Sequence, residues 1–165
     1  MSSNIWANLC DKCKHKSCCN DYVTPFLSPK EFLSIQKLGK GNFAKKIKIN
    51  NISGYELDKK EGSDQCVFWD TEKGCTVYSE RPFDCKVFPF DIYKIDGKYT
   101  WIVYSCNQDT DWTWSEKILE TMERDLFTDD VIKHLEAFTD LGRLEKSDKS
   151  YEYKILRQVR LPSNI

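Results

Sequence analysis

The sequence predicts an α+β fold, in which a small antiparallel sheet carries cysteine-rich loops at one end and packs two to three helices on one face. Three observations support this class. Asp96-Gly97, a strong hairpin signal, separates two segments rich in β-branched and aromatic residues. Two later segments repeat apolar residues at helical spacing. The chain also contains 8 cysteines, several of them in a segment with little periodicity of either kind.

Length and composition restrict the class further. The 165 residues, of which 40% are hydrophobic, suffice for a substantial core, so we expect one domain over residues 1–165. No apolar run approaches the roughly 20 residues of a membrane-spanning helix. Residues 1–7 have neither a charged start nor an apolar stretch for export. These features predict a cytoplasmic protein without a membrane segment.

The first regular element expected is a helix that starts at Ser28 and runs to about Leu38. Ser28 is the predicted N-cap, Pro29 stands in the first turn, and Glu31 completes a capping box. The expected apolar face comprises Phe32, Leu33, Ile35 and Leu38. Gly39-Lys40-Gly41 should end the helix.

Short strands are expected on both sides of polar turns. Residues 47–49 alternate, and the polar residues 58–63 form a loop. Residues 67–69 and 76–78 are strand candidates joined by a hairpin-like connection.

A stronger hairpin and a closing strand are expected later in the chain. Residues 91–95 and 98–104 flank Asp96-Gly97 and predict a hairpin. Residues 151–161 alternate again and predict a closing strand.

Two helices are expected between that hairpin and the closing strand. Residues 115–127 carry apolar residues at helical spacing, and Thr128-Asp129-Asp130 should cap a second helix that continues through Phe138. His134 lies between charged neighbours and is interpreted as a plain surface residue. Trp112 and Trp114 are unusual in an acidic loop, where they would contact a partner or cover a site.

The cysteines are Cys10, Cys13, Cys18, Cys19, Cys66, Cys75, Cys85 and Cys106. Two residues separate Cys10 from Cys13, a spacing that lets both sulfurs reach one ion. The neighbours Cys18 and Cys19 cannot easily both point to one tetrahedral centre, which suggests two centres or a ligand with a supporting thiol. Four ligands for each of two centres is the simplest division.

Three interpretations of the cysteines compete. Disulfides would fit the even count, but the absence of an export signal and the vicinal pair argue against them. Ordinary buried thiols explain one or two cysteines, not four within ten residues. Metal-binding loops explain the cluster best, and Lys12, Lys14, His15 and Lys16 would offset the thiolate charge.

Two motifs are similar to those of a known family. Residues 10–19 read Cys-Asp-Lys-Cys-Lys-His-Lys-Ser-Cys-Cys, and residues 75–89 read Cys-x-Val-Tyr-x-x-Arg-Pro-x-x-Cys-x-x-Phe-Pro. With Cys66 and Cys106, they resemble the YkgJ-type cysteine cluster family over about residues 8–107. Residues 108–165 would be a helical and strand extension. The first motif differs in its longer gap, filled by residues 14–17.

This resemblance implies a zinc- or iron-chelating domain with all eight cysteines as metal ligands. A similar module occurs in flagellin lysine N-methylases, where methyl transfer is attributed to the larger protein. Here no glycine-rich loop of the kind that holds a nucleotide-like cofactor is present, so that activity is not carried over. The sequence leaves open whether the chain is an enzyme.

Several function hypotheses follow. The first is a cytosolic protein whose iron-sulfur cluster, 4Fe-4S in preference to zinc, serves redox chemistry, metal handling or a modification reaction. The second is a structural zinc module for protein–protein interaction, or an accessory to a methylase-like enzyme. A third is a thiol-metal enzyme with an open coordination position. Each implies a protein partner or a small-molecule substrate.

Nucleic acid is not an expected partner, because the isoelectric point is about 6.2. No pattern in the sequence fixes the oligomeric state.

Other residues near the cysteines have two possible roles each. His15 competes with thiols that bind soft metals better, so we expect it to be no ligand. Arg81 would either contact a thiolate or carboxylate, or fix the turn that Pro82 opens before a short helix holding Cys85. Nearby aromatic residues should exclude water from the metal or belong to the core: Trp69, Phe83, Phe88, Phe90 and Trp101.

Overall fold

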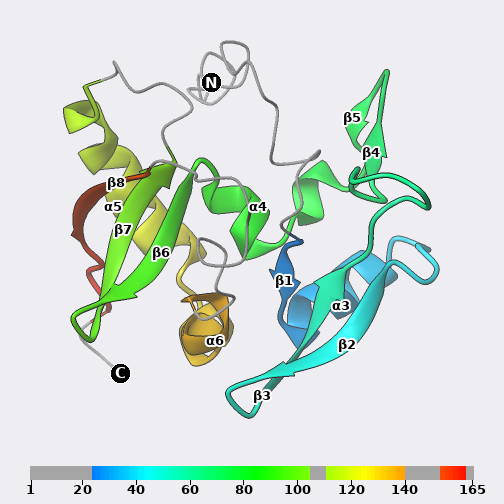
Figure 1. Ribbon diagram of the computed structural model, residues 1–165, viewed down its shortest axis with the longest axis horizontal. Helices are drawn as coiled ribbons and strands as arrows, with labels where there is room; N and C mark the ends of the chain where they lie inside the picture. The colour runs from blue at the N-terminus through cyan, green and yellow to red at the C-terminus, as the bar shows by residue number, and fades with distance from the viewer. Residues whose placement is uncertain (1–23, 105–110, 140–152, 163–165) are drawn as a thin grey trace.

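The computed structural model describes residues 24–104, 111–139 and 153–162 and confirms the α+β class (Figure 1). The strands are β1 (Phe26–Leu27), β2 (Ala44–Ile49), β3 (Ile52–Leu57), β4 (Trp69–Asp70), β5 (Gly74–Cys75), β6 (Phe90–Ile95), β7 (Lys98–Tyr104) and β8 (Tyr153–Gln158). The helices are α3 (Pro29–Gln36), α4 (Phe83–Val87), α5 (Glu116–Leu126) and α6 (Asp129–Thr139), with helical turns η1 (Tyr78–Glu80) and η2 (Thr113–Ser115).

The strands are divided among three sheets in the described part of the chain. All pairings are antiparallel, in the orders β1-β3-β2, β4-β5 and β6-β7-β8. The sequence pattern did not indicate β3, because Gly54 and the polar Ser53 interrupt the apolar alternation there.

The cap predicted for α3 is confirmed. The Ser28 hydroxyl accepts the Glu31 N–H at 3.3 Å, and the Glu31 carboxylate accepts the Ser28 N–H at 2.9 Å. The helix ends at Gln36, before the predicted end at Leu38, and Gly39 follows in the left-handed region with φ +73°.

The predicted apolar face of α3 is wrong for two of its residues. Leu33 and Leu38 are 51% and 47% exposed, whereas Ile35 is fully buried. The helix contacts the β1-β3-β2 sheet through Phe32 instead, whose ring stacks on that of Tyr55 with 3.9 Å between centroids. Leu38 also lies beyond the helix end, so it does not continue the helical face.

The Asp96-Gly97 hairpin is confirmed. Both residues have positive φ values, 50° and 76°, and Ile95 pairs with Lys98 across the turn. The predicted closing strand is β8, which pairs with β7.

The strands predicted at 67–69 and 76–78 lie closer to their turn than expected. The Asp70 carboxylate accepts the N–H groups of Glu72 and Lys73 at 2.9 and 2.8 Å, and Gly74 takes a φ of +72°. This tight turn pairs Trp69 with Cys75, so the ladder forms at β4 and β5, while Tyr78 begins η1.

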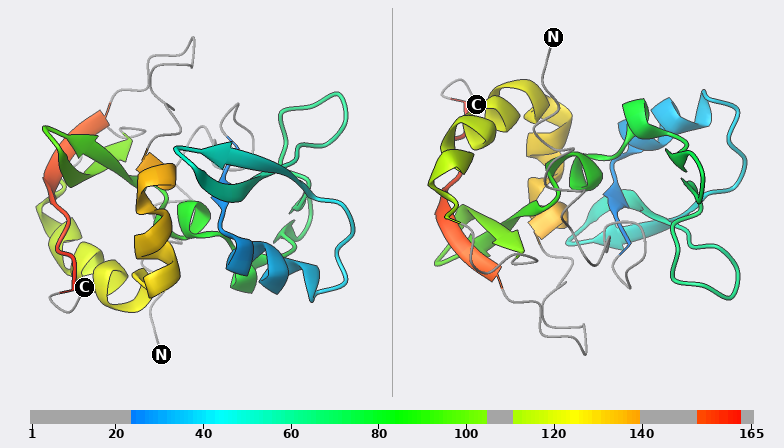
Figure 2. Two further views of the ribbon diagram at one scale, coloured as in Figure 1. Left: turned by 90° about the horizontal axis from the view of Figure 1, so that it is seen from below. Right: turned by 90° about the horizontal axis from the view of Figure 1, so that it is seen from above.

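Two hydrophobic clusters hold the described elements together, on either side of β1 and α4 (Figure 2). The larger joins β6 and β7 to α5 and α6, and the smaller joins α3 to β3 and to Phe68 and Val77. Successive side chains of a strand point to opposite faces. Phe26 of β1 therefore belongs to the larger cluster and Leu27 to the smaller.

Both predicted later helices are confirmed. Leu119 and Met122 of α5 are buried in the larger cluster, and the Thr128 hydroxyl accepts the Val131 N–H at 3.3 Å at the start of α6. No helix in the described ranges combines the length and apolar character needed to cross a bilayer.

Candidate metal centre

Cys66 lies in a turn just before β4. Its backbone forms an isolated antiparallel bridge with Lys59, and its carbonyl accepts the Trp69 N–H at 3.0 Å. Its sulfur accepts the backbone N–H of Phe68 at 3.4 Å. Backbone N–H groups that donate to sulfur are among the contacts that support a cysteine ligand of a metal.

Cys75 lies on β5, half-buried at the margin of the smaller cluster. The strand is held by the Phe68 carbonyl, which accepts the Thr76 N–H at 2.9 Å and the Thr76 hydroxyl at 3.2 Å. Because Phe68 also donates its N–H to Cys66, one residue positions the segments that carry both cysteines.

Cys85 lies in the middle of α4 and is half-buried. Phe83, Asp84 and Val87 of the same helix are buried, so the helix packs with Cys85 toward its outer side. Pro82 and Arg81 precede the helix, as predicted.

Two carboxylates fix α4 against the beginning of the described chain. Glu31 of α3 accepts the N–H of Phe83, the first residue of α4. Asp84 of α4 accepts the N–H of Phe26 at 2.8 Å. Burial raises the pKa of Glu31 above its ordinary 4.5, although the N–H groups of Ser28 and Phe83 act in the opposite direction.

The end of β7, which leads toward Cys106, also lies beside residues that follow Cys85. The Tyr104 N–H donates to the Pro89 carbonyl at 3.1 Å, and the Tyr104 hydroxyl donates to Asp91 at 2.7 Å. The α4 helix therefore contacts β1, the strand that follows the first cysteine motif in sequence. The residues just after α4 pair with the end of β7.

In one view these elements lie on the same side of the molecule, although they are spread along its length. In Figure 1, the β4-β5 hairpin, α4 and the end of β7 lie in the upper half, whereas the β2-β3 and β6-β7 turns lie at the bottom. The predicted gathering of the cysteine loops at one end of a sheet stays a prediction.

The other predicted ligands, Cys10, Cys13, Cys18, Cys19 and Cys106, lie outside the described residues, as does His15. Within residues 24–104, 111–139 and 153–162, no group of three or more His, Cys, Asp or Glu side chains is close enough to hold a metal ion. Cys66, Cys75 and Cys85 alone are thus not arranged as a complete site, and metal ligation by the eight cysteines stays a prediction.

The aromatic residues near the cysteines are mainly core residues. Phe83, Phe90 and Trp101 are at most 2% exposed and belong to the larger cluster, whereas Trp69 and Phe88 are half-buried. Trp112, predicted as a partner contact or a cover, is also a core residue, 4% exposed and packed edge-on against Phe90. Trp114 beside it is 38% exposed.

The surface interpretation of His134 is wrong, because only 5% of the residue is exposed. Its Nδ1 lies 2.7 Å from the Asp130 carbonyl, and its ring lies 6.4 Å from that of Phe26. The sequence did contain the signal: His134 follows Val131 by three positions and precedes Phe138 by four, which places all three on one helical face.

The structural interpretation of Arg81 agrees with its contacts. Its Nε donates to the Tyr78 carbonyl at 3.1 Å, and its guanidinium lies 3.7 Å from the centre of the Tyr78 ring. These contacts tie η1 to the residue before Pro82 and so fix the entry into α4.

Comparison with known proteins extends this picture. The family model CxxCxxCC, described as "Putative zinc- or iron-chelating domain", matches residues 9–115, and no solved structure matches the chain. The matched segment contains all eight cysteines and includes every described element from β1 to β7. The chain therefore belongs to the CxxCxxCC family of zinc- or iron-chelating domains.

Proposed function

We propose that this protein is a cytoplasmic iron–sulfur protein that holds a 4Fe-4S cluster through cysteine thiolates and exchanges electrons with a protein partner. The proposal rests mainly on where the cysteines lie relative to the hydrophobic clusters. A metal that merely stabilises a fold replaces missing core energy. A metal at the margin of a complete core is available for chemistry.

The described cores are extensive without any metal. Among the described residues, the larger cluster contains no cysteine, and its members include fully buried aromatic residues such as Trp101 and Phe90. Cys66 and Cys75 only border the smaller cluster, and Cys85 is half-buried. A purely structural zinc ion is therefore less well supported than a functional centre.

The donor chemistry agrees with the proposal. Sulfur ligands suit both iron–sulfur clusters and zinc. The N–H group that Phe68 donates to the Cys66 sulfur is the kind of contact that tunes a cluster's reduction potential. Eight cysteines that bind metal must stay reduced, and thiols stay reduced in the cytoplasm. The proposed metal ligation therefore supports a cytoplasmic location.

The identity of the metal is tested on full-length protein purified without oxygen. The proposal expects iron and acid-labile sulfide in equal amounts, with a broad visible absorption that bleaches when dithionite is added. Stoichiometric zinc in a colourless protein, with no iron uptake on reconstitution, would reject the cluster and support the structural zinc module.

The ligand assignment is tested with two matched variants. Cys85→Ser should lose the metal of at least one centre, because a serine hydroxyl is a poor substitute for a thiolate with soft metals. His15→Ala should retain nearly all metal, since imidazole competes poorly with the neighbouring thiols. Equal metal content in Cys85→Ser and the parent protein would remove Cys85 from the ligand set.

A further inference from the structure

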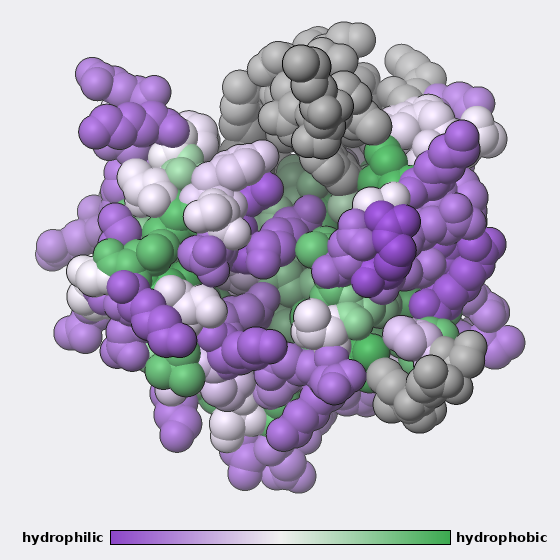
Figure 3. All heavy atoms as spheres, turned by 180° about the vertical axis from the view of Figure 1, so that it is seen from behind, coloured by the Kyte–Doolittle hydropathy of each residue, from purple (hydrophilic) through white to green (hydrophobic). Residues whose placement is uncertain are grey.

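A small pocket lies where α3, η1, α4 and the turn between α5 and α6 meet. Its volume is about 170 Å³. Figure 3 shows the molecule from behind, with a recess near the middle of that face. Pockets for drug-sized ligands are typically about 300–1,000 Å³, so this one suits a ligand of only a few heavy atoms.

Arg81 lines the pocket in a fixed orientation. Its Nε bond to the Tyr78 carbonyl and the stacking of its guanidinium on the Tyr78 ring use one edge and one face of the group. Its two Nη atoms have no hydrogen-bond partner within the described part of the chain. A guanidinium held this way presents two parallel donors, which match the oxygens of a carboxylate or phosphate.

Two further cations line the same pocket. Lys30 comes from the first turn of α3, and Lys86 comes from α4. In the ranges that the structure describes, neither ammonium group forms an ion pair. The first turn of α6 also borders the pocket through Asp130 and Val131, which adds the positive end of that helix dipole.

The acidic groups around the pocket are mostly engaged already. Glu31 accepts the N–H groups of Ser28 and Phe83, and Asp130 accepts the Ser28 hydroxyl. Asp125 accepts two bonds from Arg124, at 2.6 and 2.9 Å. Glu31, Glu80, Asp125 and Asp130 thus place four carboxylates beside three cations, so recognition of an anion here depends on the Nη atoms of Arg81 and not on an excess of positive charge.

We propose that this pocket binds a small molecule through a phosphate or carboxylate group, with Arg81 as the bidentate donor and Lys30 and Lys86 as flanking cations. Of the cysteines that the structure describes, Cys66, Cys75 and Cys85, none lines the pocket. A phosphate and a carboxylate both offer two negatively charged oxygens that can lie in the plane of the guanidinium.

The proposal is tested by isothermal titration of full-length protein with inorganic phosphate and, separately, with acetate. We expect saturable binding of at least one anion at about one per chain, and the arm that binds identifies the group. Arg81→Gln should weaken the affinity about tenfold or more, because a charge-assisted bidentate contact is lost. Lys86→Gln should weaken it by a smaller factor.

The matched control is Lys98→Gln, which removes an exposed lysine at the β6-β7 turn, away from the pocket. It should leave the affinity unchanged. Because Arg81→Gln also removes the bond to Tyr78, Lys86→Gln keeps the test independent of that turn. Absence of saturable binding to either anion would overturn the proposal. So would an equal loss of affinity in Lys86→Gln and Lys98→Gln. Neither result depends on which metal the protein holds.

Discussion

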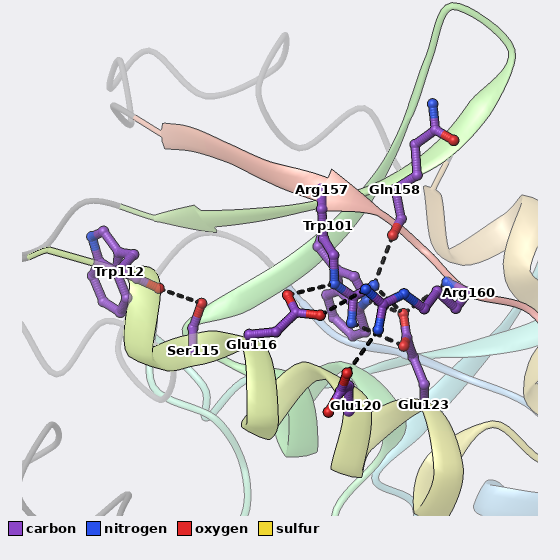
Figure 4. A network of polar contacts seen from close by, with 9 residues as sticks. All are labelled: Trp101, Trp112, Ser115, Glu116, Glu120, Glu123, Arg157, Gln158 and Arg160. Carbon is purple, nitrogen blue, oxygen red and sulfur yellow. Dashed lines mark hydrogen bonds and ion pairs between the residues drawn. The ribbon is translucent and has the colours of Figure 1, made fainter.

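At the residue scale, the carboxylate of Glu123 on α5 joins β7, β8 and the segment after β8 (Figure 4). Its oxygens accept the Trp101 indole N–H at 2.8 Å, the Arg160 backbone N–H at 2.8 Å, and two bonds from Arg157 at 2.7 and 3.0 Å. Burial acts to raise the pKa of Glu123, but these donors outweigh it and hold the pKa below the ordinary 4.5.

Glu123→Gln should lower the free energy of unfolding by about 2 kcal/mol near neutral pH, because bonds to a charged acceptor are lost in a buried site. A depressed folded-state pKa stabilises the protein above the ordinary value of 4.5, and this contribution disappears as the pH falls through the folded pKa. The difference between parent and variant should therefore shrink below pH 4.5. Urea unfolding over a pH series measures it.

The control for this prediction is Glu120→Gln on the same helix. Glu120 is exposed and pairs with the exposed Arg160 side chain at 2.7 Å, an ion pair of the kind that contributes little. Its substitution should change stability by less than about 0.5 kcal/mol. A constant difference between Glu123→Gln and the parent protein across the acidic range would contradict the assigned pKa direction.

At the scale of the element, β3 depends on the absence of a side chain at Gly54. A Cβ placed there would lie 2.1 Å from a ring carbon of Phe26 and 2.8 Å from the Leu27 carbonyl oxygen. The Phe26 ring cannot simply move away, because it packs edge-on against Phe138 of α6 at 5.1 Å between centroids. The close approach of β1 to β3 therefore requires glycine.

Gly54→Ala should destabilise the protein by about 1–3 kcal/mol, the usual cost of overpacking a core. The sign of the change in the free energy of unfolding is informative. Where there is room for a Cβ, alanine in place of a strand glycine stabilises the protein by reducing the entropy of the unfolded chain. Gly41→Ala is the matched control, since no atom lies within 4 Å of a Cβ there. Thermal unfolding of both variants gives the comparison, and similar midpoints would contradict the packing argument.

At the scale of the whole molecule, the two clusters predict how the protein responds to loss of its metal. Removal by a chelator under reducing conditions should leave the far-ultraviolet circular dichroism largely unchanged. The near-ultraviolet signal should also persist, because Trp101 and Trp112 are buried at 0% and 4% exposure within the larger cluster. The thermal midpoint should fall by a few degrees, not collapse.

Phe26→Ala provides the reference for a disrupted core. Truncating a buried phenylalanine costs about 3–5 kcal/mol, so this variant should lose the near-ultraviolet signal at a lower temperature than the metal-free protein. Cooperative loss of secondary structure on chelation alone would instead identify the metal as structural.

The amino-acid sequence by itself determined the features that depend on neighbouring residues. The capping box of Ser28 and Glu31, the Asp96-Gly97 turn and the Thr128 cap each involve contacts within a few residues, so their residue types suffice to predict them. The same holds for the cysteine motifs, whose order and spacing identify the family and its zinc or iron chelation.

Tertiary structure decided what depends on residues far apart in the chain. Glu31 caps α4 at Phe83, and Phe26 crosses Gly54, although 52 and 28 positions separate these residues. In neither pair does the local sequence identify the distant partner, and the pocket around Arg81 likewise exists only where several elements meet. The burial of His134 is an intermediate case. The sequence shows that His134 lies on the apolar face of its helix, but Phe26, whose ring lies near it, comes from a distant strand. Local hydrogen bonds can be predicted from residue types, because both partners lie within a few positions of each other. Packing depends on which surfaces of the whole chain are buried together, so it is decided only by the tertiary structure.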